Sequence, residues 1–194
     1  MQETDEILIK KIATGDEIAF EEMVLRYQNK VLNLIYRHIN SSSEAEEIAQ
    51  DVFVKVWSQA KSFKGNSKLS TWLYRIAINL SINHLRKKKL KTVSLDKGIF
   101  LPDGKIKKDI AAPIDLQPDF AMAKNRQALL IKNAVDSLPP TQKTAFILSK
   151  YENHSYARIS EIMNLSIPAI ESLLFRAKQN LKKFLLPFRE KGEL

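Results

Sequence analysis

The chain has 194 residues, 31 Lys or Arg against 22 Asp or Glu, a net charge of +9, three His and no Cys. The lack of Cys excludes a disulfide framework and any thiolate nucleophile or metal ligand, and three scattered His residues argue against a metal site of another kind. The acidic N-terminus and the absence of an apolar run of about 18 residues predict a protein that is soluble, not exported and cytoplasmic.

Charge is unevenly distributed along the chain. The stretch from Val52 to Leu95 holds ten Lys or Arg residues and no Asp or Glu, whereas residues 1–51 hold 11 acidic residues. A surface that faces a polyanion explains this segregation better than solubility does, because a mixed surface would keep the protein equally soluble. Aromatic and amide side chains between Phe63 and Lys89 indicate contact with bases as well as phosphates.

The hydrophobic pattern predicts an all-α protein of two small helical domains. Only five Gly and seven Pro occur, and apolar residues recur at a spacing of about 3.6 rather than 2. A first helix is expected over residues 5–13 and a second from the N-cap Asp16 to about Ile39. A third helix is expected to begin at Ser43, where Ser43-x-x-Glu46 forms a capping box.

The third and fourth helices carry many of the candidate contact residues. Outside the apolar side of the third helix lie Gln50, Asp51, Phe53 and Trp57. The fourth helix is expected from about Lys68 to Lys89. At about 100° per residue, its core side is formed by Leu69, Leu73, Ile76 and Leu80, and its separate polar side is formed by Arg75, Asn79, Asn83 and Arg86. Trp72 lies on the border between the two sides. Such a helix can pack on a bundle and face a ligand at once.

Residues 94–122 interrupt the helical pattern. Pro102, Gly104, Pro113 and Pro118 are interspersed with five Asp, which predicts a linker that is extended or partly disordered.

Helical spacing resumes near Phe120, and two capped helices follow further on. Ser155 precedes a short helix to Met163, Asn164 suits a tight turn, and Ser166 precedes the next helix. This arrangement predicts a helix-turn-helix. Its second helix presents Ser172, Phe175, Arg176 and Gln179 opposite the core stripe, where a recognition helix faces the major groove.

Several motifs together resemble the extracytoplasmic-function sigma factors of bacterial RNA polymerase, the smallest members of the primary sigma family. The motifs are Asp16-Glu-x-Ala-Phe20 followed by Tyr27, Ala45-Glu-Glu-Ile-Ala-Gln-Asp-Val-Phe-Val-Lys-Val-Trp57, Ser70-Thr-Trp-Leu-Tyr-Arg-Ile-Ala-Ile-Asn79, Leu138-Pro and Ile170-Glu-Ser-Leu-Leu-Phe-Arg-Ala-Lys178. Because they occur in the family's order across both domains, they are more specific than a lone helix-turn-helix. The resemblance implies a region 2-like domain over residues 1–93, a linker over 94–122 and a region 4-like domain over 123–190.

The resemblance also implies roles for particular residues. Those expected to bind the clamp helices of the largest polymerase subunit are Gln50, Asp51, Phe53 and Trp57. Those expected to bind the minus-ten element, with an unpaired base held by the loop over residues 64–70, are Lys64, Ser67, Lys68, Trp72, Arg75, Asn79, Asn83, Arg86, Lys87 and Lys88. Those expected to read the minus-thirty-five duplex are Arg158, Glu171, Ser172, Phe175, Arg176, Lys178 and Gln179.

The partners implied by the resemblance are core RNA polymerase, through its clamp helices and beta flap, and promoter DNA. Members of the family are usually held inactive by an anti-sigma factor, often membrane-anchored, so a protein of this kind is a further expected partner. No cofactor, metal or small-molecule substrate is expected.

Two departures from the family pattern limit what can be transferred. The family often has Glu at the position of Arg158, and Lys and Arg at those of Glu171 and Leu173. A carboxylate at position 171 can accept a hydrogen bond from a cytosine amino group or simply repel phosphate. The preferred minus-thirty-five sequence is therefore not implied.

Two other functions stay open at this level. A stand-alone helix-turn-helix repressor or activator, with an N-terminal sensing or dimerisation domain, would have no reason to carry the acid-free helices or a polymerase-contact surface. A nucleic-acid-processing enzyme should show carboxylates near the basic face, and the stretch from Val52 to Leu95 has none, so no catalytic residue is predicted. Plainer alternatives also exist for single residues: Phe53, Trp57 and Trp72 as core, and the lysine run from Arg86 to Lys91 as a solvated domain edge.

Overall fold

The computed structural model of this protein describes residues 3–96 and 119–192. These residues form eight α-helices and one 3-10 helix, with no strand among them, which confirms the predicted all-α class. In chain order the elements are α1 (Asp5–Ala13), α2 (Glu17–Ile39), α3 (Ser42–Gln59), η1 (Ala60–Ser62), α4 (Leu69–Asp96), α5 (Asp119–Asp136), α6 (Pro140–Lys150), α7 (Tyr156–Met163) and α8 (Ile167–Glu190). Among the described helices, none combines the length and the apolar character needed to cross a membrane.

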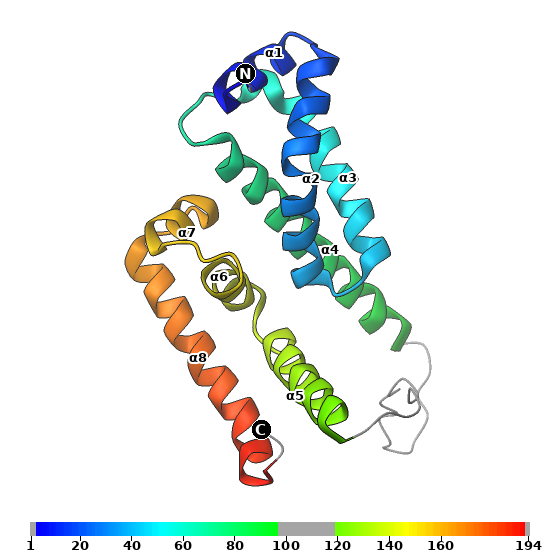
Figure 1. Cartoon of the computed structure of the whole chain (residues 1–194), viewed down its shortest axis with the longest axis vertical. Helices are drawn as coiled ribbons and strands as arrows, with labels where there is room; N and C mark the ends of the chain where they lie inside the picture. Colours follow the sequence, from blue (N-terminus) through cyan, green and yellow to red (C-terminus); the bar gives the residue numbers. More distant parts are fainter. Residues whose placement is uncertain (1–2, 97–118, 193–194) are drawn as a thin grey trace.

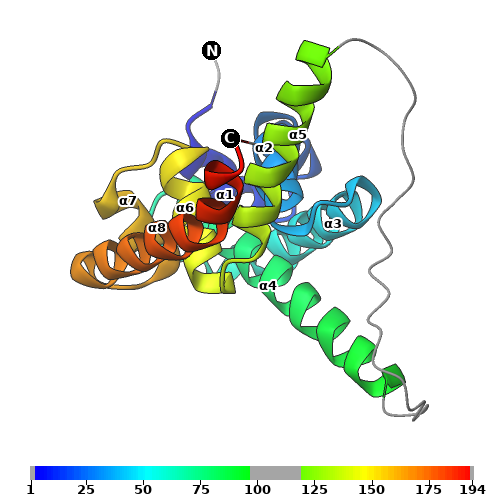
Figure 2. The same ribbon diagram turned by 90° about the horizontal axis from the view of Figure 1, so that it is seen from below.

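The helices form two groups that pack side by side (Figure 1). In the first group α2 packs against α1, α3 and α4, and in the second α8 packs against α5, α6 and α7. The groups meet where α7 contacts α4 and α6 contacts α2. The C-terminal part of α4 projects away from both groups (Figure 2).

Capping residues account for most helix starts, with one correction to the expected positions. Asp16 caps α2 as predicted, because its carboxylate accepts from the Ala19 amide at 3.0 Å. The cap of α3 is Ser41, whose hydroxyl accepts from the Glu44 amide at 3.4 Å, so the prediction that Ser43 is the cap was wrong by two residues. The reason is that Asn40 takes a left-handed conformation (φ 60°) and ends α2, which leaves Ser41 as the extended residue before the next helix.

Helix α4 is longer than expected. It begins at Leu69, close to the predicted start, but continues to Asp96 rather than ending near Lys89. No Gly or Pro occurs between Gly65 and Gly98, so nothing in that stretch forces the helix to stop. Since α5 begins at Asp119, both ends of the predicted linker 94–122 are helical, and its remaining part, 97–118, lies outside the described residues.

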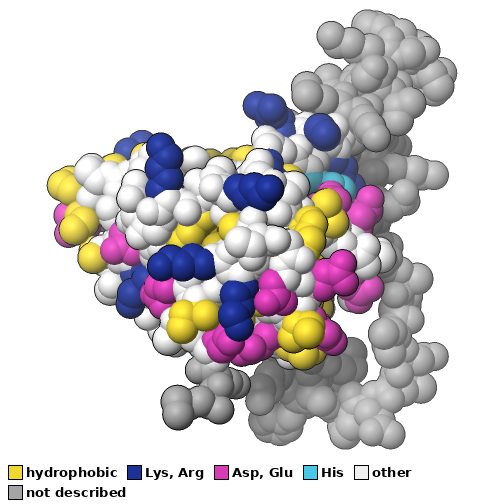
Figure 3. Space-filling model, turned by 90° about the horizontal axis from the view of Figure 1, so that it is seen from above, with side chains coloured by type: hydrophobic (Ala, Val, Ile, Leu, Met, Phe, Trp, Pro, Cys, Tyr) yellow, Lys and Arg dark blue, Asp and Glu magenta, His cyan; other side chains and the backbone are white. Residues whose placement is uncertain are grey.

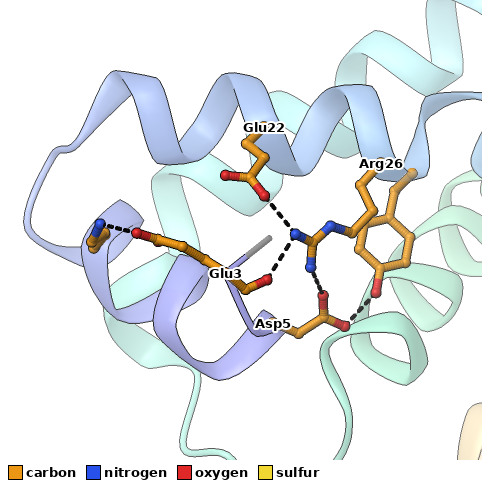
Figure 4. Close-up of polar contacts among 6 residues, drawn as sticks. Glu3, Asp5, Glu22 and Arg26 are labelled. Carbon is orange, nitrogen blue, oxygen red and sulfur yellow. Dashed lines mark hydrogen bonds and ion pairs between the residues drawn. The ribbon is translucent and has the colours of Figure 1, made fainter. Parts of the chain in front are cut away.

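A polar cluster fixes α1 on α2 (Figure 4). The Arg26 guanidinium lies 2.8 Å from an Asp5 carboxylate oxygen, 2.5 Å from Glu22, and donates to the Glu3 carbonyl at 2.8 Å. The Tyr27 hydroxyl donates to the other Asp5 oxygen. Burial and this hydrogen bond raise the pKa of Tyr27, so the phenol keeps its proton. The cluster therefore holds α1 beside η1, and α1 lines one depression together with the loop that precedes α4.

The helix-turn-helix is formed as the caps predicted. Ser155 accepts from the Arg158 amide at 3.2 Å, and Ser166 accepts from the Ala169 amide at 3.4 Å. Asn164 lies between the two helices with φ 53°. The side chains that pack α7 against α8 are buried: Ile159, Ile162, Ile170 and Leu174.

Candidate polymerase and promoter interfaces

Two depressions follow the line where α2 and α3 pack together. One, of about 260 Å³, is lined by Gln50 and Phe53 of α3 and by residues of α2. The other, of about 430 Å³, is lined by Glu17, Phe20, Val54 and Trp57. Asp51 lines neither depression but is exposed on the same helix. The predicted polymerase-contact residues therefore lie along one helix, next to concave surface.

The two aromatic residues of this set differ in exposure. Phe53 is only 9% exposed and belongs to the core, so it forms the floor of its depression, and the plainer alternative of a core role describes its position correctly. Trp57 is 37% exposed, and its ring packs edge-on against Phe20 at 4.9 Å between centroids. Only Trp57 can offer its ring to a partner without rearrangement.

Helix α2 supplies the opposite wall of the first depression, which sequence reasoning did not include. Its contributions are Val24, Gln28, Asn29 and Leu32. Nearby apolar residues are also exposed, with Ile18 at 80% and Leu25 at 64%. An apolar residue such as Leu25, outside the core stripe of an amphipathic helix, is the sequence signal that could have indicated this wall. Seen from the end of the molecule where α1 lies, hydrophobic side chains are interspersed with acidic ones over the lower half of the face (Figure 3).

The loop before α4 is basic and solvent-exposed. Lys64 and Lys68 are exposed, Ser67 is half-buried, and Gly65 adopts φ 73°, a conformation that favours glycine. Trp72 is half-buried, and its ring packs on Phe63 at 5.1 Å. Trp72 thus connects the loop to α4.

The polar side of α4 is open in its middle and engaged at both ends. Its exposed residues are Asn79, Asn83, Arg86 and Lys87. At one end Arg75 is half-buried and donates to the Glu161 carbonyl of α7 at 2.7 Å. At the other end Lys88 and His84 contact Glu44 at 2.7 and 2.9 Å, and these contacts lower the pKa of the Glu44 carboxyl.

The outward side of α8 holds six of the seven residues predicted to read the minus-thirty-five duplex. Exposed there are Glu171, Phe175, Arg176, Lys178 and Gln179, with Phe175 63% exposed. Ser172 is half-buried and accepts from Arg176 at 2.8 Å. The seventh residue, Arg158, does not join them, because its side chain points at α4 and donates to Ser70 at 2.7 Å and to the Thr71 hydroxyl.

A buried polar group between α2 and α6 was not predicted to have any role. His38 is 2% exposed and Lys143 is 5% exposed. The Lys143 ammonium donates to the His38 carbonyl and to Asp136, both at 2.8 Å. Burial, with a further contribution from the Lys143 charge, lowers the pKa of His38 to about 4. Nothing in the local spacing of these residues indicates that they meet.

The chain matches two protein families, one in each half. Sigma-70 region 2 matches residues 23–91, and Sigma-70, region 4, matches residues 128–181. The RNA polymerase sigma-H factor of Pseudomonas aeruginosa is 34% identical over 190 residues, which cover 96% of each chain. The ECF RNA polymerase sigma-E factor of Escherichia coli is 30% identical with the same coverage.

Two solved structures share the fold. The sigma factor RpoE of Bartonella quintana, in complex with the anti-sigma factor NepR, has a TM-score of 0.59 and 25% identity, and the match covers 86% of this chain and 96% of that one. CnrH, in complex with the cytosolic domain of CnrY, has a TM-score of 0.65 and 18% identity, over 94% and 97% of the two chains. With matches in both halves and a relative 34% identical along nearly its whole length, this protein belongs to the extracytoplasmic-function sigma factors of bacterial RNA polymerase.

Proposed function

We propose that this protein is a promoter-specificity subunit that binds core RNA polymerase, directs it to particular promoters and helps open the minus-ten DNA. The observation that carries this proposal is the match of one chain to region 2 and region 4 in order, at 96% coverage of full-length sigma factors. The alternative of a stand-alone helix-turn-helix regulator leaves the acid-free stretch from Val52 to Leu95 without a role.

Within this function, α4 and the loop before it bind the opened strand. Flipping a base out of the duplex costs a few kcal/mol of stacking energy, which contacts with the exposed base must offset. Asn79 and Asn83 offer amides for such contacts, and Arg86 and Lys87 offer charge for the neighbouring phosphates. No acidic residue occurs on this helix before Asp96, so the helix's own side chains up to that point do not repel the backbone.

Helix α8 reads duplex DNA upstream. Its outward side combines an arginine suited to guanine, an aromatic ring suited to a thymine methyl and a carboxylate suited to a cytosine amino group. These side chains are Arg176, Phe175 and Glu171, and all three are exposed.

Polymerase attachment takes place along α3 and the depressions beside it. Gln50 and Asp51 supply polar contacts and Trp57 supplies an accessible ring. Region 4 additionally contacts the beta flap. An anti-sigma factor is a further proposed partner, because the sigma factor RpoE of Bartonella quintana has the same fold and was solved in complex with the anti-sigma factor NepR.

The test is transcription by purified core polymerase with a library of promoter fragments, with mapping of the transcript starts. Added protein should stimulate initiation at a subset of fragments that share two sequence elements. Absence of stimulation, together with tight duplex binding by the protein alone, would favour the helix-turn-helix regulator instead.

The attachment surface has its own test. Replacing Gln50 and Asp51 together with Ala should weaken binding to core polymerase about tenfold or more, as removal of central polar contacts does at many interfaces. Glu47→Ala, an exposed acidic residue of the same helix, is the matched control. Equal core affinity for the double variant and the control would place the attachment surface elsewhere.

A further inference from the structure

Helix α1 lies outside the part of the chain that matches region 2. The match begins at residue 23, whereas α1 ends at Ala13. The helix is nevertheless fixed in the first helical group, because three of its apolar side chains are buried and the Arg26–Asp5 ion pair ties its first turn to α2. It lies beside η1 at one end of the bundle and forms a fixed part of the surface there (Figure 1).

Between α1 and the segment that precedes α4 lies a depression of about 360 Å³. Its apolar lining comes from Ile9 and Ala13 of α1, from Ala60 of η1 and from Phe63. Ile9 and Ala60 are buried, so they form its floor. None of the described α4 residues lines it, which makes it distinct from the polar side of that helix. Ordinary small-ligand sites have volumes of about 300 to 1,000 Å³, and a nucleobase is smaller than that.

Three lysines surround the apolar floor. Lys10 comes from α1, Lys61 from η1 and Lys64 from the loop, and all three are exposed. The one acidic residue of the lining is Glu6, so three positive charges face one negative charge. Surface lysines on one element would indicate only a solvated face. Here they come from three separate elements around one concave apolar surface, which favours an anionic ligand with an apolar body.

The depression adjoins the surface proposed to bind the opened strand. The Phe63 ring, half-buried, packs on Trp72 at 5.1 Å and so links the depression to the start of α4. Lys64 belongs both to the depression and to the loop expected to hold an unpaired base. A single-stranded nucleic acid is bound by stacking of bases on aromatic side chains and by cations along its phosphates. An aromatic wall, an apolar floor and a basic rim supply both kinds of contact.

We propose that this depression holds a second base of the opened strand, next to the base held by the loop over residues 64–70. The inference rests on the proposed function, because it places a further nucleotide of the same strand. The base packs against Phe63 and Ile9, and Lys10 binds an adjacent phosphate. The small side chain of Ala13 leaves room for the base. Helix α1 therefore takes part in promoter recognition, through a contact that the region 2 match does not include.

Open complexes of the whole protein with core polymerase test the site directly, on a promoter taken from the fragment library. The photoreactive residue p-benzoylphenylalanine is introduced in place of Glu6, which lines the depression, or in place of Ile7, which is 45% exposed and does not. Position 6 should cross-link to one or two adjacent nucleotides of the opened strand, and position 7 should not. No cross-link from position 6, or equal cross-links from both positions, would overturn the proposal.

Two substitutions separate the base contact from the phosphate contact. Ala13→Phe fills the depression without changing charge, so it should shorten the lifetime of the open complex about fivefold or more, as loss of one stacked base does. An abasic site at the cross-linked nucleotide should abolish this difference between Ala13→Phe and the natural protein. Lys10→Ala should weaken the intact and the abasic promoter by the same factor, and more at low salt.

The matched control is Lys11→Ala, an exposed lysine of the same helix that does not line the depression. It should leave the open complex unchanged. Thermal unfolding and affinity for core polymerase are measured for each variant, so that a folding or attachment defect is recognised. An Ala13→Phe effect that persists on every abasic promoter, together with no effect of Lys10→Ala, would also overturn the proposal.

The same measurements separate this inference from the proposed function. If specific initiation occurs but position 6 does not cross-link to DNA, only the second base site is wrong. If no initiation occurs, the proposed function is wrong, and the free full-length protein is then cross-linked to a mixed-sequence single-stranded 20-mer. A cross-link from position 6 but not from position 7 would still support a single-strand site between α1 and the loop, and its absence would refute that site as well.

Discussion

The two helices proposed to bind DNA are used in different ways by the fold. Helix α8 buries one stripe, including Ile170, Leu174 and Ala177, and leaves its opposite side to solvent. Helix α4 buries Leu69 and Leu73 and also packs Tyr74 against His154 of the second group. The surface of α8 proposed to read duplex DNA is thus exposed in the free protein. The helix proposed to bind the opened strand, α4, is partly covered by the second group.

This difference has a physical basis in the two ligands. Duplex DNA is present before polymerase binds, so burying the outward side of α8 in the free protein would bring no advantage. Exposed bases exist only after melting, and the contact that engages Arg75 meanwhile reduces the charge that α4 offers to other polyanions.

The largest effect is expected from the core of α4. Leu73 is fully buried, so Leu73→Ala should lower the free energy of unfolding by about 2 to 5 kcal/mol, through lost apolar burial and a residual cavity. Phe175→Ala on the outward side of α8 should change it by less than about 0.5 kcal/mol. Denaturant titration measures both. A large loss for Phe175→Ala would mean that the outward side of α8 is structural, and the comparison would fail.

Sequence patterns predicted this helix well on one side and poorly on the other. The i, i+3 and i+4 spacing identified Leu69, Leu73 and Ile76 because periodicity reports contacts within a helical bundle. The same spacing could not show that Tyr74 would pack against His154, 80 positions later, since that depends on how two domains pack. Caps were predictable to within two residues because they depend on neighbours, whereas the end of α4 was missed because no Gly or Pro marks it.

The candidate contact residues show the same limit. The residues of α8 were placed correctly on one outward side, since a two-turn helical pattern determines which residues share a side. Arg158 and Arg75 were expected to face solvent or DNA, but each donates across the domain interface. The buried set around His38 and Lys143 gave no sequence signal, because its members are separated by about a hundred residues.

Acid should weaken the packing between the two helical groups where α2 meets α6. His38 lies beside Lys143 of α6, which forms an ion pair with Asp136 of α5. The His38 ring has a pKa of about 4 when the two groups are packed together, against an ordinary value of 6.5. Above pH 6.5 the ring is neutral whether or not the groups are packed together and has no effect. Between pH 6.5 and about 4 only the separated form binds the proton, so the packing should weaken by up to about 3 kcal/mol. The distance between spin labels on cysteines introduced at exposed Asn33 of α2 and Lys182 of α8, followed against pH, measures this.

A matched variant isolates the contribution of His38. His154 also lies at the interface, and burial together with the Arg158 charge lowers its pKa, so it acts in the same direction. His38→Gln should remove most of the pH dependence and leave the smaller part due to His154. An unchanged pH profile in His38→Gln would assign the effect to other groups.

A substitution on the outward side of α8 should change DNA recognition but not the packing between the two helical groups. Arg176→Ala should reduce discrimination within the upstream element by about 1 to 3 kcal/mol if the guanidinium makes a bidentate contact with a guanine. Binding to a panel of single-base variants of that element measures the loss. A uniform loss on all sequences would instead identify a phosphate contact, and a change in the label distance would contradict the separation between α8 and the domain interface.

The smallest effect is expected at the far end of α4, where Glu44 partly offsets the basic surface. Its pKa is lowered by hydrogen bonds from Lys88 and His84, so its contribution to stability is present above the ordinary carboxyl pKa and is lost on acidification. Because Lys88 is exposed, Glu44→Gln should cost only about 0.5 kcal/mol of unfolding free energy at neutral pH. The same change should strengthen binding of a mixed-sequence single-stranded 20-mer slightly, and more at low salt than at high salt, since one negative charge leaves the surface. Glu47→Gln, on the same helix without these contacts, is the control. If both variants bind the single strand equally well, Glu44 of α3 does not reduce the affinity of α4 for DNA. The affinity then depends on the charges of α4 alone.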